Sequence, residues 1–251
     1  WRAGGEDGED FFGLISKVLI DEDGTIYLLD TRLSEVPVYS PGGERLDTLS
    51  REGEGPGETR MPTNLVFMPD GNLGLVQRFP GKIVTIDRQG DPAGDFEPKL
   101  PDAGFMLLTD CFTNRQGQLT VVGMNVKQES QTKRDNITFV SSFGTDGQEK
   151  GRFVEQHNPT DFTKFHFDEN EQNEVTFRQA AVGQDGRVYV SMVRNAYRIH
   201  VFAPDGHLER IIEREYEPRQ RTAQEYQEIE DLARRQTERL PGARIDISNV
   251  H

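Results

Sequence analysis

The chain has 251 residues, 34% of them hydrophobic, a formal net charge of −14 and an isoelectric point near 4.8. Nucleic acid and bare anionic lipid are poor partners for so acidic a chain, because binding to either depends on Lys and Arg. The single cysteine, Cys111, excludes a disulfide framework and Cys-based zinc sites, and no apolar run is long enough to span a membrane as a helix.

Residues 1–10 are rich in glycine and acidic side chains, and we expect them to form a flexible acidic arm. After this arm, the stretch VLIDEDGTIYLLD (18–30) consists of an apolar run, a turn that ends in Gly24 and a second apolar run. The same pattern returns around Gly71, Gly117 and Gly186. A hairpin turn that needs positive φ at its last residue favours glycine there.

A second glycine turn follows each of these copies, at Gly43, Gly90, Gly147 and Gly206. The first three copies recur 47 and 46 residues apart, and two insertions, near residues 127–136 and 157–174, lengthen the third. Two hairpin turns in a period in the mid-forties mean four short strands per repeat, which is typical of a β-propeller blade. We therefore predict an all-β fold with four propeller blades of four strands each over residues 11–216.

The pattern breaks at Pro218, where a helical insertion is expected over residues 217–242. Thr222 and Glu225 have the spacing of a capping box, and Pro241-Gly242 would end the helix. Tyr226, Ile229, Leu232, Ala233 and Leu240 are expected on one apolar stripe. Residues 243–251 are interpreted as the start of a further blade, so that the ring as given is incomplete and leaves an uncovered apolar face.

The runs VLIDEDGTIYLLD (18–30), VPVYSPGGERL (36–46) and SREGEGPGETRMPTNLVFMPDGNL (50–73) resemble the NHL-type six-bladed propellers of bacteria. Blades two and three depart from that pattern, with Gly74-Leu75 and Arg115-Gln116 at positions where the family has other residues. The resemblance implies a longer parent protein that is exported to the periplasm or the cell surface.

Related propellers include lactonases and lyases that hold a metal in the central channel, a site that needs ligands converging from several blades. No His pair with metal-ligand spacing, no calcium loop and no nucleophile elbow can be assembled from this sequence. His166, between two phenylalanines, is the only histidine in an apolar setting and is interpreted as a packed, hydrogen-bonded imidazole rather than as a ligand. We therefore predict no catalytic residue, no metal ligand and no cofactor.

Two surfaces remain as candidates for binding a protein partner. Aromatic side chains on a long insertion can anchor a partner or fold back over a blade. Arginines gathered in the last third of the chain can form a docking surface or a solvated helix face with Glu–Arg pairs. The predicted partner-binding residues from these two surfaces are Phe162, Phe165, Phe167, Arg219, Arg221, Tyr226, Arg234 and Arg235.

The function that these observations favour is a non-catalytic protein-binding or scaffolding propeller outside the cytoplasm. An extrinsic subunit docked on a membrane-associated complex, for example a respiratory or photosynthetic one, would suit an acidic and incomplete ring. The alternative is a metal-dependent propeller enzyme of the lactonase or lyase type. A third possibility is a sensor domain for a small molecule or glycan, for which the sequence offers no discriminating residue.

Overall fold

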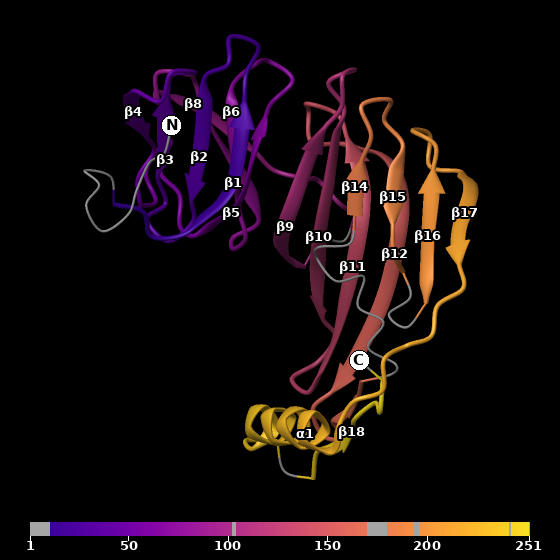
Figure 1. Cartoon of the computed structure of the whole chain (residues 1–251). Coiled ribbons are helices and arrows are strands. Elements are labelled where there is room, and N and C mark those ends of the chain that lie inside the picture. The colour runs from indigo at the N-terminus through magenta and orange to yellow at the C-terminus, as the bar shows by residue number, and fades with distance from the viewer. Residues whose placement is uncertain (1–10, 102–103, 170–179, 193–195, 241, 251) are drawn as a thin grey trace.

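The computed structural model describes residues 11–101, 104–169, 180–192, 196–240 and 242–250. Four antiparallel four-stranded sheets follow one another along the chain, and in each of them consecutive strands are neighbours (Figure 1). The first two sheets contain β1 (Ile15–Ile20), β2 (Ile26–Asp30), β3 (Val36–Tyr39), β4 (Arg45–Leu49), β5 (Pro62–Phe67), β6 (Leu73–Gln77), β7 (Lys82–Ile86) and β8 (Pro92–Phe96). The last two contain β9 (Phe105–Thr113), β10 (Leu119–Gln128), β11 (Lys133–Phe143), β12 (Glu149–Asp161), β14 (Ala180–Val182), β15 (Val188–Val190), β16 (Tyr197–Phe202) and β17 (Leu208–Arg214).

The glycine turns form as the sequence predicts. Gly24, Gly71, Gly117 and Gly186 have φ values of 80°, 87°, 73° and 82°, a region that residues with a Cβ rarely adopt. The second turn of each repeat has the same feature, with φ between 78° and 96° at its glycine. In the first turn the Asp21 carboxylate also accepts hydrogen bonds from the amides of Asp23 and Thr25. Local turn chemistry therefore divides the chain into hairpins.

The sheets stand side by side, and their first strands β1, β5, β9 and β14 contact one another in succession. The core consists of three apolar layers, one between each pair of neighbouring sheets. Leu29 and Leu65 lie in the layer between the first and second sheets, Ile83 and Phe139 in the next, and Val140 and Val188 in the last. The described residues therefore form four blades of a β-propeller, mostly β with one helix, as the sequence predicts.

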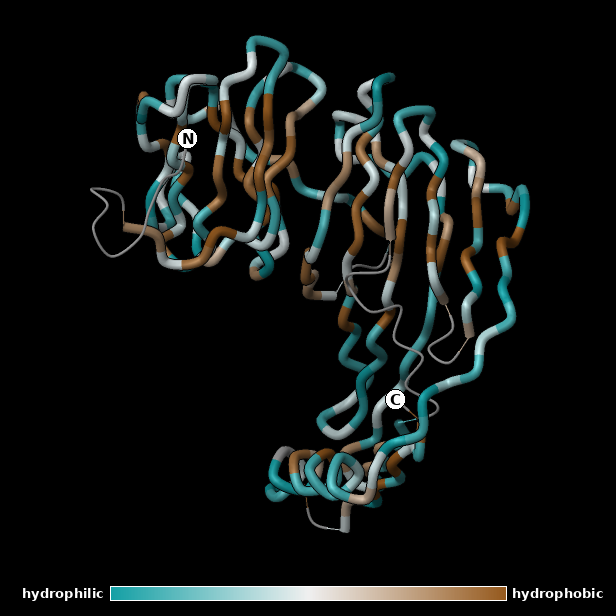
Figure 2. Tube along the Cα trace, in the orientation of Figure 1, coloured by the Kyte–Doolittle hydropathy of each residue, from teal (hydrophilic) through white to brown (hydrophobic). Residues whose placement is uncertain are grey.

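The polar segment 127–136 was expected as an insertion between two strands of the third blade. In the structure, β10 and β11 instead continue through most of it, with Lys127 opposite Asp135 and Gln128 opposite Arg134. β12 pairs along the same extension, so that Lys133 faces Asp161. Backbone hydrogen bonds to neighbouring strands hold these polar residues in strands without an apolar face. We call this extension, formed by the ends of β10, β11 and β12, the extended arm. It is hydrophilic toward its tip and extends beyond the other blades (Figure 2).

The first and last blades carry exposed apolar side chains. Val18 and Ile20 on β1 are 50% and 60% exposed, while Leu19 between them packs into the first apolar layer. On β17, Leu208, Ile211 and Ile212 are 42–47% exposed. Within the described residues, these two blades have a neighbouring blade on one side only, which leaves Val18 and Ile20 in contact with solvent. Ile211 and Ile212 point to opposite faces of β17 and are both exposed because β17 is also the edge strand of its sheet.

The remaining elements lie at the far end of the extended arm (Figure 1). They are the helix α1 (Ala223–Thr237) and the parallel pair of β13 (His166–Asp168) and β18 (Arg244–Asp246). The expected acidic arm, residues 1–10, lies outside the described residues. Within the described part of the chain, no helix is long and apolar enough to cross a membrane.

Candidate functional site

The aromatic insertion and the C-terminal segment, which the sequence suggested as separate surfaces, form one unit. β13 pairs in parallel with β18, and β18 contacts α1. Residues 165–169, 219–237 and 244–250 together are called the C-terminal unit. Its parts are held by backbone bonds from the Arg244 amide to the Phe165 carbonyl (2.9 Å) and from the Arg221 amide to the Asn249 carbonyl (2.9 Å).

A buried ion pair lies at the centre of this unit. The side chains of Arg221 and Glu169 are 4% and 9% exposed. Two nitrogens of the guanidinium donate to the two carboxylate oxygens at 2.6 and 2.7 Å, and one of them also donates to the Ser248 carbonyl at 2.8 Å. The Ser248 amide donates to Glu169 at 3.0 Å. The hydrogen bond to Glu169 raises the pKa of Arg221, so its guanidinium stays charged at neutral pH. Arg221 therefore fixes the shape of the unit, and any effect it has on a partner would be indirect.

Helix α1 begins with the predicted capping box. The Thr222 hydroxyl accepts from the Glu225 amide at 3.2 Å, and the Glu225 carboxylate accepts from the Thr222 amide at 2.9 Å. Arg219 donates to the same carboxylate at 2.8 Å. The Arg219 guanidinium, followed by the bonds from Thr222, lowers the pKa of Glu225 to about 2. The helix start is therefore held by an ionised carboxylate across the physiological range.

The outer part of the helix carries the other predicted residues. Tyr226 is half-buried, Arg234 donates to Glu230 at 2.6 Å, and Arg235 is exposed. Ala233 is buried, but Leu232 is 45% exposed, although both were expected on the apolar stripe. Consecutive residues of a helix point about 100° apart, so Leu232 lies at the edge of the stripe that buries Ala233.

The three phenylalanines occupy different places. Phe162 packs its ring against the Arg134 guanidinium, with 4.9 Å from Cζ to the ring centroid, so it belongs to the extended arm. Phe165 and Phe167 are half-buried in the C-terminal unit, on either side of His166. The three phenylalanines therefore do not form one exposed patch. They lie where the extended arm joins the C-terminal unit.

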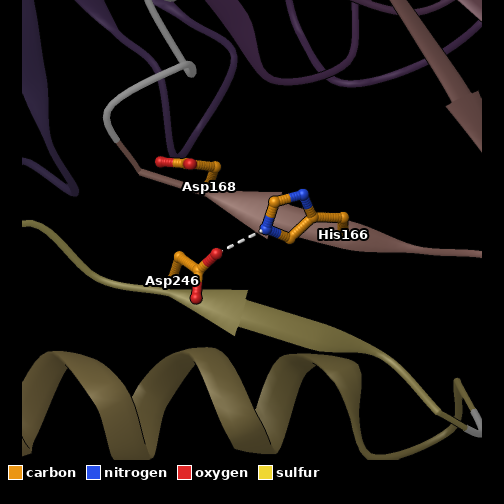
Figure 3. A group of neighbouring side chains, drawn as sticks. All are labelled: His166, Asp168 and Asp246. Carbon is orange, nitrogen blue, oxygen red and sulfur yellow. Dashed lines mark hydrogen bonds and ion pairs between the residues drawn. The ribbon is translucent and has the colours of Figure 1, made fainter.

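His166, Asp168 and Asp246 lie on one face of the parallel pair (Figure 3). The imidazole Nε2 of His166 lies 2.8 Å from the Asp246 carboxylate, and one ligand atom from each of the three residues lies within 4.8 Å of the others. Arg244 also contacts Asp246 at 2.8 Å. The bonds from His166 and then Arg244 hold the pKa of Asp246 below its ordinary value. His166 is hydrogen-bonded as expected, but it is exposed rather than packed, and its partner is a carboxylate 80 residues away that the sequence alone does not connect to it.

A cavity of about 490 Å³ adjoins this group, and His166 and Asp168 are part of its lining. The rest of the wall comes from the end of β12 and from the residues that follow it, including His157, Asp161 and Phe165. The cavity is thus formed by the arm on one side and by β13 on the other.

A second polar site lies on the innermost strands of the blades. Asn64 on β5 donates to the Asp110 carboxylate on β9 and to the Cys111 carbonyl. Burial raises the pKa of Asp110 to about 6, against the lowering effects of the Cys111 amide, the Lys17 charge and Asn64. Three blades therefore contribute to one carboxyl site, which the sequence signals only by an aspartate inside the apolar run FMLLTDCF. Cys111 itself is buried, and burial raises the pKa of its thiol, as for an inert core cysteine.

No protein-family model and no curated protein matches the chain. Among solved structures, the chain is similar to a Bacteroides fragilis protein that is described as exported. The two share 10% identity over 85% of this chain and 53% of that chain, with a TM-score of 0.53. The chain also matches a streptogramin B lyase with 12% identity, 81% and 55% coverage and a TM-score of 0.44. A protein described as a 6-phosphogluconolactonase from Bacteroides uniformis matches with 16% identity, 79% and 55% coverage and a TM-score of 0.44. The chain spans about half the length of these proteins, and the first of these likenesses agrees with the blades in showing a β-propeller fold.

Proposed function

We propose that the chain is a non-catalytic, protein-binding propeller that works outside the cytoplasm as an extrinsic subunit of a membrane-associated complex. The resemblance to NHL-type six-bladed propellers of bacteria supports an exported scaffold, and so does the description of the Bacteroides fragilis protein as exported. The net charge of −14 favours a protein partner over nucleic acid or lipid.

The observation that carries this proposal is the construction of the C-terminal unit. Its central charges are paired and buried, so they hold helix α1 in one orientation at the end of the extended arm. The helix then presents an exposed Leu232 beside Arg235 to solvent. An apolar side chain with an arginine next to it fits a partner with an apolar pocket and nearby carboxylates.

The test is to purify the tagged chain from detergent-solubilised membranes of its source and to measure the stoichiometry of what accompanies it. We expect a fixed set of membrane proteins in constant ratio to the chain. The double variant Leu232→Asp/Arg235→Glu should lose them, and Arg115→Glu, a change at an exposed blade turn, should retain them. A chain that is recovered alone would refute the proposal.

The Asp110 site favours the enzymatic alternative, because a carboxyl with a raised pKa between blades is typical of a general base or acid. Lys17 and Asn64 would then position the substrate or stabilise charge beside it. The metal-dependent form of this alternative needs ligands from several blades. The group of three His, Asp or Glu side chains found within the described residues lies in the C-terminal unit instead. Hydrolysis of a panel of lactones by the purified chain, abolished in Asp110→Asn, would establish the enzyme and displace the scaffold.

A further inference from the structure

We propose that His166, Asp168 and Asp246 form a binding site for a divalent transition metal ion, zinc being the clearest case, which links β13 to β18. This site is independent of the proposed docking function, because its ligands lie on β13 and β18 rather than on helix α1, and its occupancy can be measured on the chain alone.

The strand register brings the three donors together. His166 and Asp168 are two residues apart on β13, so they point to the same face of the strand, and Asp246 stands opposite Asp168 on β18. Figure 3 shows the His166 ring and the Asp246 carboxylate facing one another across the two strands, with Asp168 beside them. Ligand atoms within 4.8 Å of one another need to move by little more than a side-chain rotation to share one ion.

The donor set selects the class of metal. One imidazole with two carboxylates suits zinc and its first-row neighbours, whereas calcium and magnesium prefer oxygen ligands alone. Three protein ligands leave at least one coordination position open. The cavity of about 490 Å³ beside His166 and Asp168 gives room for water in that position.

Arg244 is the group that opposes a cation here, because its guanidinium contacts the Asp246 carboxylate at 2.8 Å. Its side chain is 72% exposed, so it can turn into solvent when an ion takes its place. The sign of its effect follows from its charge: removing Arg244 should strengthen metal binding. A cluster that existed only as a salt bridge would lose its arrangement when Arg244 is removed.

A metal at this position would join residues that are 80 positions apart in the chain. Binding to the folded form alone stabilises it by mass action. The stabilisation should be concentrated in the C-terminal unit, since both strands belong to it.

The experiment is isothermal titration of the purified chain with zinc chloride and, separately, with calcium chloride. We expect one equivalent of zinc and weaker calcium binding. His166→Gln, Asp168→Asn and Asp246→Asn should each weaken zinc binding by at least about tenfold, and Arg244→Ala should strengthen it severalfold. His207→Gln is the matched control, because His207 also pairs with an aspartate, Asp205 at 2.6 Å, but in a blade turn.

Each variant is checked by thermal unfolding, and Asp168→Asn remains a test if the exchange at His166 or Asp246 disturbs the fold. Zinc binding that persists unchanged in the three ligand variants would overturn the proposal. The absence of zinc binding to the unaltered chain, a preference for calcium, or an equal loss in His207→Gln would also overturn it.

Discussion

The buried pair of Arg221 and Glu169 gives the sharpest prediction about how the C-terminal unit is held together. Arg221→Met removes the bidentate guanidinium from a carboxylate that is 9% exposed, while the hydrogen bond from the Ser248 amide remains. Breaking a buried pair on one side costs about 3–5 kcal/mol, because an uncompensated charge remains inside. Since Glu169 retains the hydrogen bond from the Ser248 amide, we expect the lower part of this range, about 3 kcal/mol.

The assay is native-state hydrogen exchange at the Arg244 amide, which is bonded to the Phe165 carbonyl across β13 and β18. A loss of about 3 kcal/mol accelerates exchange there by about a hundredfold. Amides of β6 in the second blade are the internal reference and should be unaffected, because the pair contacts no blade core. The double variant Arg221→Met/Glu169→Leu removes both charges and should recover most of the loss.

An acceleration of less than tenfold at Arg244 would refute this reasoning, as would equal acceleration in β6. A double variant that is less stable than Arg221→Met would show that the side-chain volume and the hydrogen bond to Ser248, rather than the loss of the opposite charge, carry the effect.

Further predictions concern the blades and the helix start. The pKa of Asp110 is raised from 3.8 to about 6, so folding favours its protonated form. The contribution of Asp110 to the free energy of unfolding is therefore full below about pH 4 and is lost as the pH rises through 6. The pKa shift corresponds to a change of about 3 kcal/mol in the free energy of unfolding between about pH 4 and 8. Asp110→Asn should remove this change from urea unfolding curves measured across that range, and an unchanged pH dependence would contradict the raised pKa of Asp110. Leu65→Ala, in the layer between the first two blades, should lower the free energy of unfolding by about 3 kcal/mol, whereas Leu46→Ala, 57% exposed, should change it by less than about 0.5 kcal/mol. Thr222→Ala should cost about 1 kcal/mol of helix stability, read as faster exchange of the Glu225 amide, and Thr222→Ser should retain the cap.

The blades could be predicted because their signals are local. Each glycine turn depends on a few neighbouring residues, and positive φ at Gly24 or Gly186 follows from the turn alone. The helix start is equally local, since Thr222 and Glu225 lie three residues apart. These short-range features fix the repeat, and the repeat fixes the propeller.

The site residues could be named in part, but their grouping could not be predicted. Arg221 was expected at a docking surface, while its partner Glu169 lies 52 residues earlier in the chain. The parallel pairing of β13 with β18 likewise depends on tertiary contacts and has no turn or spacing that marks it. The raised pKa of Asp110 reflects burial between blades, which no local pattern reports.

The central claim is that helix α1 of the C-terminal unit meets a protein partner. The most direct measurement places a photo-crosslinking amino acid at position 232 and, in a second strain, at position 115, and irradiates the living cells. A discrete covalent adduct with one membrane-complex protein from position 232, and none from position 115, is the predicted result. Adducts from neither position, or the same adducts from both, would contradict it.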